Sequence, residues 1–151
     1  MLFRSTGFGG ASAVTVGGVA AASFSVVSAT TIHAVTPAGG VGAKDVRVTA
    51  PGGIATRVGG FTYYGAPTIT SVSPSTGPLA GGTSITITGT NLTGTTSVTV
   101  GGAAAPSFSA ASATSLTVVV PAGTEGTKAV VVTTPGGSVT KTDGFTYVAA
   151  P

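Results

Sequence analysis

Apolar and polar residues alternate with a period of two over short stretches of the chain, and Gly or Pro stands at the ends of most of these stretches. This pattern predicts β-strands. A loop is predicted for residues 75–82 from their composition. In the second half of the chain, the predicted strands cover 67–72, 83–89, 98–100, a short segment around Phe108, 116–120, 130–132 and 139–147. About seven short strands with frequent turn signals predict a two-sheet, all-β sandwich.

The chain repeats itself after 84 residues without a gap. When residues 1–63 are aligned with residues 85–147, 32 of the 63 positions are identical. Such self-similarity indicates tandem structural units. The sequence predicts a first unit over 1–65 that lacks its opening strand, because no residues align with 67–84, and a complete second unit over 66–151. It is interpreted either as a window on a longer array or as a chain whose first unit has lost that strand.

Composition excludes several classes of protein. Charged residues make up 6% of the chain, against roughly 25% in an average globular protein, yet the alternating Val, Ile and Phe argue against disorder. The six basic residues are spread thinly, which disfavours nucleic acid as a partner. There is no cysteine, no apolar run of about 20 residues and no signal-peptide pattern, so we expect no disulfide and no membrane insertion.

Residues that could carry chemistry are few and scattered. The three acids, Asp45, Glu125 and Asp143, do not recur between the repeats, and His33 is the only histidine. A lone histidine without cysteine or clustered acids forms neither a catalytic triad nor a zinc site, and we expect it to be a solvated residue on an outer strand face. Asn91 begins a glycosylation sequon, which matters only in a eukaryotic secretory pathway. We therefore predict no catalytic, cofactor-binding or metal-binding residues, no cofactor and no enzymatic activity.

The spacing of Gly, Pro and apolar residues in the second unit resembles a known family. The quoted positions are Pro67, Ile69, Val72, Pro74, Gly77-Pro78, Gly81-Gly82-Thr83, Ile85, Ile87, Gly89, Asn91-Leu92, Val98, Val100-Gly101-Gly102, Val120-Pro121-Ala122-Gly123, Val132, Pro135-Gly136-Gly137, Phe145 and Tyr147. Together they resemble the IPT/TIG domains. The resemblance covers 67–148 and, apart from the missing opening, 1–63.

This resemblance implies two immunoglobulin-like β-sandwich units in tandem. Members of the family occur in cell-surface receptors such as plexins, in bacterial surface and secreted proteins, as accessory modules of polysaccharide-acting enzymes, and in Rel-type transcription factors. The family has no catalytic residues to carry over, so its fold alone does not give a function.

Two places in the chain are candidate interaction sites. Met1 and Phe3 align with Ile85 and Ile87 and would form an open sheet edge in the first unit. Another polypeptide could supply the missing strand there by β-strand addition. The second place is the inter-unit junction Tyr64, Gly65 and Ala66. Because this linker has only three residues, we expect the two units to form a short, semi-rigid rod, with Tyr64 packing between them.

These observations favour a non-catalytic structural or adhesive module that acts by protein–protein assembly, through self-association or within a larger complex. It would be extracellular or surface-exposed, either as a virion decoration or tail-associated protein or in a bacterial surface fibre. The alternative is an accessory carbohydrate-binding module of a secreted protein, although the chain has no Trp for an aromatic binding face. A dimerisation or DNA-binding domain of a transcription factor is disfavoured by the thin basic charge.

Overall fold

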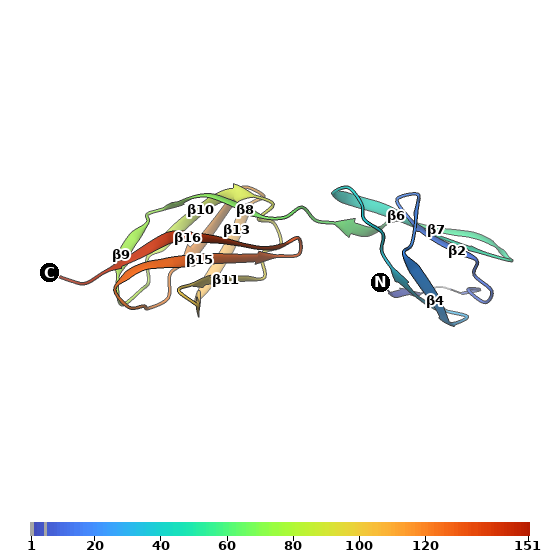
Figure 1. Cartoon of the computed structure of the whole chain (residues 1–151), viewed down its shortest axis with the longest axis horizontal. Coiled ribbons are helices and arrows are strands. Elements are labelled where there is room, and N and C mark those ends of the chain that lie inside the picture. The colour runs from blue at the N-terminus through green and yellow to red at the C-terminus, as the bar shows by residue number, and fades with distance from the viewer. Residues whose placement is uncertain (1, 5) are drawn as a thin grey trace. The chain divides into compact units, whose positions relative to one another are not determined.

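The computed structural model describes residues 2–4 and 6–151, with only the backbone described for residues 2–4. Its contacts divide the chain into two units, Met1–Tyr63 and Tyr64–Pro151. Every regular element of the described residues is a β-strand, and the strands form four sheets, two in each unit (Figure 1). The predicted all-β class with two sandwich units is confirmed.

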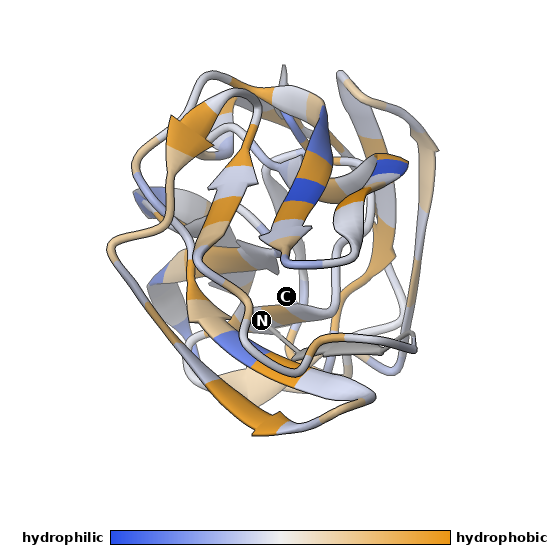
Figure 2. Ribbon diagram, turned by 90° about the vertical axis from the view of Figure 1, so that its right-hand side faces the viewer, coloured by the Kyte–Doolittle hydropathy of each residue, from blue (hydrophilic) through white to orange (hydrophobic). Residues whose placement is uncertain are grey.

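The second unit contains nine strands in two sheets. The first sheet has the order β13-β14-β10-β8, and the second has the order β12-β11-β15-β16-β9. The strands are β8 (Thr68–Ser73), β9 (Thr76–Pro78), β10 (Ser84–Thr90), β11 (Ser97–Val100), β12 (Ala103–Ala104), β13 (Ser107–Ser112), β14 (Ser115–Val119), β15 (Gly126–Thr134) and β16 (Gly137–Val148). The predicted period of two reappears in the burial of β10 and β11, where buried residues alternate with less buried ones, and Figure 2 shows hydrophobic and hydrophilic bands alternating along strands of the chain.

The opening segment of the second unit pairs first with one sheet and then with the other. Strand β8 runs antiparallel to β10, and β9 runs parallel to β16 with Gly77 opposite Tyr147. The prediction of a loop over 75–82 is therefore wrong for Thr76–Pro78. Three residues are too few to show an alternation, and their strand geometry depends on backbone pairing with β16, which is distant in the sequence.

The core of the second unit lies between its two sheets. It is made of twelve buried side chains: Ile85, Ile87, Leu92, Val98, Val100, Leu116, Val118, Val120, Val130, Val132, Phe145 and Tyr147. The rings of Phe145 and Tyr147 meet edge to face with centroids 5.1 Å apart, an arrangement that aromatic pairs favour. The Tyr147 hydroxyl donates a hydrogen bond to the Pro121 carbonyl, so its polar end is satisfied inside the core.

The first unit repeats this architecture at an offset of 84 residues. Its sheets have the orders β1-β5-β4 and β3-β2-β6-β7. The strands are β1 (Leu2–Arg4), β2 (Ala13–Val16), β3 (Val19–Ala20), β4 (Ser23–Ser28), β5 (Thr31–Val35), β6 (Gly42–Ala50) and β7 (Gly53–Tyr63). The backbone pairing is also repeated, since Phe3 is opposite Ile32 in the strand register just as Ile87 is opposite Leu116.

The core of the first unit is smaller. Its buried side chains are Phe8, Val14, Val16, Ile32, Ala34, Val46 and Val48. Phe61 and Tyr63 are only half-buried, whereas their counterparts Phe145 and Tyr147 are each 1% exposed. In the second unit, β9 covers this place, because a Cβ built on Gly77 would lie 2.9 Å from the Phe145 ring. The described residues of the first unit contain no strand equivalent to β8 or β9.

Candidate functional site: the open side of the first unit

Strands β1 and β7 form the side of the first unit that differs most from the second. Their counterparts β10 and β16 pair with β8 and β9, whereas β1 pairs only with β5 and β7 only with β6 among the described residues. The predicted edge residue Phe3 lies in β1, and Met1 lies outside the described residues. That these residues mediate assembly stays a prediction.

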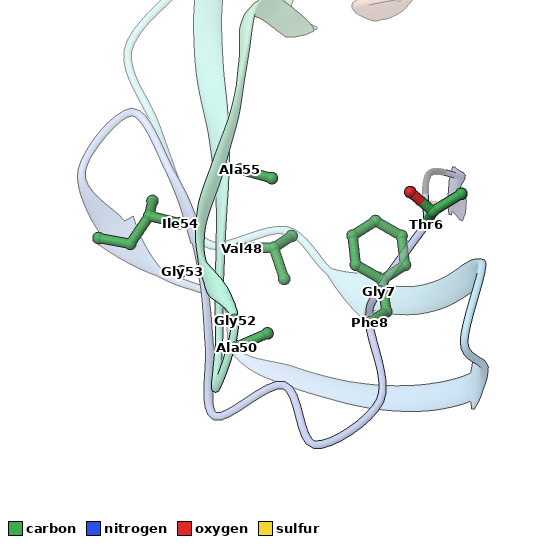
Figure 3. A pocket seen from close by; sticks show the side chains of 9 residues that line it. All are labelled: Thr6, Gly7, Phe8, Val48, Ala50, Gly52, Gly53, Ile54 and Ala55. Carbon is green, nitrogen blue, oxygen red and sulfur yellow. The ribbon is translucent and has the colours of Figure 1, made fainter.

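A pocket of about 300 Å³ opens between the start of this unit and the β6–β7 hairpin. Its lining residues are Thr6, Gly7, Phe8, Val48, Ala50, Gly52, Gly53, Ile54 and Ala55, and Thr6 carries the only polar side chain among them. Figure 3 shows Val48, Ala50 and Ala55 pointing toward Phe8, whereas Ile54 points away from it. Because Thr6 carries its only polar side chain, the pocket holds no set of groups for acid–base chemistry.

Residues 64–66 fill the equivalent space in the second unit. A Cβ on Gly136 would overlap the carbonyl of Gly65, whereas its counterpart Gly52 has nothing within 4 Å. The Asn91 side-chain amide donates a 2.9 Å hydrogen bond to the carbonyl of Ala66. Asn91 has a φ of 55°, and it aligns with Gly7, whose φ is 82°. Both residues tolerate this left-handed conformation, but only Asn91 can hold the incoming chain.

Sequence reasoning missed this role of Asn91. The signal was the replacement of Asn91 by Gly7 at a conserved turn of the repeat, but only the structure shows that the amide reaches Ala66. Of the predicted junction residues, Gly65 and Ala66 contact Gly136 and Asn91 within the second unit, and Tyr64 is 54% exposed. A role for Tyr64, Gly65 and Ala66 between the units stays a prediction.

The titratable side chains are dispersed. His33 is exposed on β5, as predicted, and Asp45, Glu125 and Asp143 are all exposed. One oxygen of Asp45 accepts a 2.9 Å hydrogen bond from the backbone of Gly59, which gives this carboxylate a local structural role. No group of three or more His, Cys, Asp or Glu that could hold a metal ion occurs within the described part of the chain.

The buried polar groups are paired. Within the described residues, no buried side-chain nitrogen or oxygen lacks a hydrogen-bond partner. Burial raises the pKa of Tyr147 above its ordinary value, which is expected for a phenol that would have to ionise inside an apolar core. No helix in the described residues is long and apolar enough to cross a membrane.

Two face-to-face sheets, antiparallel except where β9 runs parallel to β16, and an opening segment that pairs with both define the second unit as an immunoglobulin-like sandwich. The family model described as the IPT/TIG domain matches residues 67–147. The chain therefore belongs to the IPT/TIG domain family, and the resemblance seen in the sequence is confirmed. No protein with a curated description matches the chain.

Solved structures with a similar fold come from larger proteins. The full extracellular region of plexin A4 matches with a TM-score of 0.63 and 24% identity, covering 93% of this chain and 13% of that one. SGBP-B from a complex xyloglucan utilization locus in Bacteroides uniformis matches with a TM-score of 0.50 and 19% identity, covering 96% of this chain and 44% of that one. A structure with xylogluco-oligosaccharide matches with a TM-score of 0.52 and 18% identity, covering 93% and 36%.

These identities establish a shared fold and no more. The chain spans less than half the length of each of these three structures. A resemblance limited to the fold leaves ligands and partners to be argued from the residues of this chain.

Proposed function

We propose that this chain is a non-catalytic accessory module of a surface-exposed protein, in which the two sandwiches support neighbouring domains. The observation that carries this proposal is that the cores are built of apolar side chains and the outer strand faces carry mainly Ser and Thr hydroxyls. Ser and Thr hydroxyls on neighbouring strands bond each other, as Thr127 does to Thr146 at 3.1 Å and Thr133 to Ser138 at 3.0 Å. Hydroxyls that bond each other in this way cover the surface of a sheet and form no pair of nucleophile and general base.

A surface location is supported by the kinds of protein in which the same fold occurs. The plexin match is an extracellular region, and SGBP-B belongs to a xyloglucan utilization locus. In each case a segment as long as this chain is one part of a longer protein. A virion role and self-assembly draw no support from these neighbours and stay predictions from the sequence.

A second candidate function is that of a carbohydrate-binding accessory module. One matched protein comes from a xyloglucan utilization locus and another matched structure contains a xylogluco-oligosaccharide, which favours this candidate over assembly on a virion. Sugar rings are bound largely by stacking on exposed aromatic faces, which are apolar surfaces with polar edges. The exposed aromatic side chains of the described residues are Tyr64, 54% exposed, and Phe24, 36% exposed, and a single ring is a small platform for an oligosaccharide.

Calorimetric titration with a xyloglucan oligosaccharide separates the two candidates. A support module gives no heat of binding with the 151-residue chain. Saturable binding that is lost in a Tyr64→Ala variant, and kept in a Phe24→Ala variant, would replace the support role with a carbohydrate-binding one. The Phe24 variant is the matched control, because both substitutions remove an exposed ring.

A further inference from the structure

Strand β4 forms an edge of the first unit on the side opposite β1. Its sheet has the order β1-β5-β4, so β4 pairs only with β5 among the described residues. The counterpart β13 is likewise the last strand of its sheet in the second unit, where β8 is present and lies at the other edge. The free edge at β4 therefore belongs to the repeat itself and does not depend on a strand beside β1.

Three apolar side chains of β4 are uncovered at this edge. Phe24 is opposite Ala34 in the strand register, and Ala34 is buried. Val26 is opposite Ile32, which is buried as well. Cross-strand partners share a face, so Phe24 and Val26 lie on the core-facing side of the sheet, yet they are 36% and 39% exposed, and Val27 is 59% exposed. A strand added to this edge would cover all three side chains.

Most of the features that usually protect a sheet edge are missing from β4. Edge strands of soluble proteins carry charges, proline or bulges that discourage pairing with another chain. Residues 23–28 contain no charged residue and no proline. Their one irregularity lies between Val26 and Ser28, so the register from Ser23 to Val26 is regular. This stretch can pair with a further strand.

The distribution of charge favours a second copy of the chain as the partner. No Lys, Arg, Asp or Glu stands between Arg4 and Lys44. Arg4 lies in β1, at the opposite edge of the same sheet, and Lys44, Arg47 and Arg57 lie in β6 and β7 of the other sheet. A partner strand with charged side chains would find no counter-charge at this edge, whereas a second β4 brings no charge and keeps the basic residues of the two copies apart.

We propose that β4 of the first unit pairs antiparallel with β4 of a second copy, around a two-fold axis at Ser25. With Ser25 opposite itself, Phe24 is opposite Val26 of the partner subunit, and this apolar pair occurs twice on the core-facing side. Main-chain hydrogen bonds along the paired edges supply affinity. The two-fold symmetry uses up both edges, so the assembly closes at a dimer.

The second unit provides an internal comparison. Its edge strand β13 has the same length, but Ala110 and Ala111 align with Val26 and Val27. The smaller side chains offer less apolar surface to a partner strand. The proposal therefore assigns the contact to β4 and not to β13.

Sedimentation of the 151-residue chain at concentrations from about 1 μM to 1 mM tests the association, because a single strand pair is a small interface and binds weakly. We expect the mass to rise with concentration to that of a dimer and no further. A monomer throughout this range would overturn the proposal, and so would masses beyond the dimer.

Lysine substitutions at two aligned serines test the axis. Ser25 and Ser109 are both exposed, on β4 and β13. Ser25→Lys should weaken the dimer at least about tenfold, because it places two like charges directly opposite each other. Ser109→Lys is the matched control and should leave dimerisation unchanged, and thermal melting verifies that both variants fold. Equal dimerisation of the two variants would rule out an axis at Ser25.

Cysteine cross-linking tests the same register independently, since the chain has no cysteine. Residues directly opposite in an antiparallel pair have Cα atoms about 4.5–5.5 Å apart, within the range of about 4.4–6.8 Å that a disulfide spans. Under mild oxidation, Ser25→Cys should form a disulfide-linked dimer, and Ser109→Cys should stay largely monomeric. Equal cross-linking of the two variants, or none in either, would overturn the proposal.

Discussion

One substitution made at two aligned glycines should change stability in opposite directions. Gly52 and Gly136 occupy the same position in the Pro-Gly-Gly turn of each unit. Neither has a left-handed φ, so alanine can adopt the backbone conformation at both. The two sites differ in what surrounds them, because Gly136 lies under the carbonyl of Gly65 and Gly52 has nothing within 4 Å.

The magnitudes follow from these surroundings. Gly52→Ala should stabilise the first unit by about 0.4–1 kcal/mol, because alanine lowers the conformational entropy of the unfolded chain and meets no neighbour. Gly136→Ala should destabilise the second unit by about 1–3 kcal/mol, because a backbone carbonyl must move to make room for the methyl group. For a domain of this size, each kcal/mol shifts Tm by roughly 4–8 °C.

Scanning calorimetry of the two variants and the unaltered chain measures these shifts, with hydrogen exchange assigning each transition to its unit. We expect the transition of the first unit to rise in Gly52→Ala and that of the second unit to fall in Gly136→Ala. Equal shifts in the two variants would refute the reasoning, since they would mean that residues 64–66 do not occupy the space over Gly136.

Three further predictions concern the same contrast between the units. Asn91→Gly copies the residue of the first unit and keeps the turn, so it should lower the free energy of unfolding only by the lost side-chain hydrogen bond, about 0.5–1.5 kcal/mol. It should also speed amide exchange at Ala66, and unchanged exchange would contradict the hydrogen bond between Asn91 and Ala66. Phe145→Ala should cost the second unit about 3–5 kcal/mol, and Phe61→Ala should cost the first unit less because that ring is half-exposed; equal losses of unfolding free energy in urea would argue against a covering role for β9. Burial raises the pKa of Tyr147, so above a pH of about 10, the pKa of a tyrosine in the unfolded chain, the folded protein keeps a proton that the unfolded chain loses. The free energy of unfolding should therefore fall as pH rises above that value. Tyr147→Phe should flatten this fall, and identical pH profiles of the two proteins would contradict a raised pKa at Tyr147.

Much of the fold follows from the sequence because its signals are local. Alternation such as Ile85 and Ile87 marks a strand with one buried face, and paired glycines mark the turns. The repeat then aligns every strand of the first unit with one of the second, and the structure keeps that alignment in its register. His33, predicted to be solvated, is exposed for the same reason, since it alternates with the buried Ile32.

Other features depend on segments that are distant in the sequence. The strand nature of Thr76–Pro78 comes from pairing with β16, some 70 residues later, and no local pattern announces it. The hydrogen bond between Asn91 and Ala66 likewise joins two loops that are distant in the sequence. The half-burial of Phe61, against the full burial of the identical Phe145, reflects the presence or absence of a neighbouring strand.

The sequence by itself determined the period-two strands, the 84-residue repeat and the scarcity of residues that could do chemistry. These properties are carried by side-chain type and by spacing along the chain, which are local quantities. Only the tertiary structure decided which edges are covered, which glycines lie under another backbone and where a pocket remains. Those properties depend on which atoms from distant residues approach one another, and two identical residues such as Phe61 and Phe145 can therefore differ in burial.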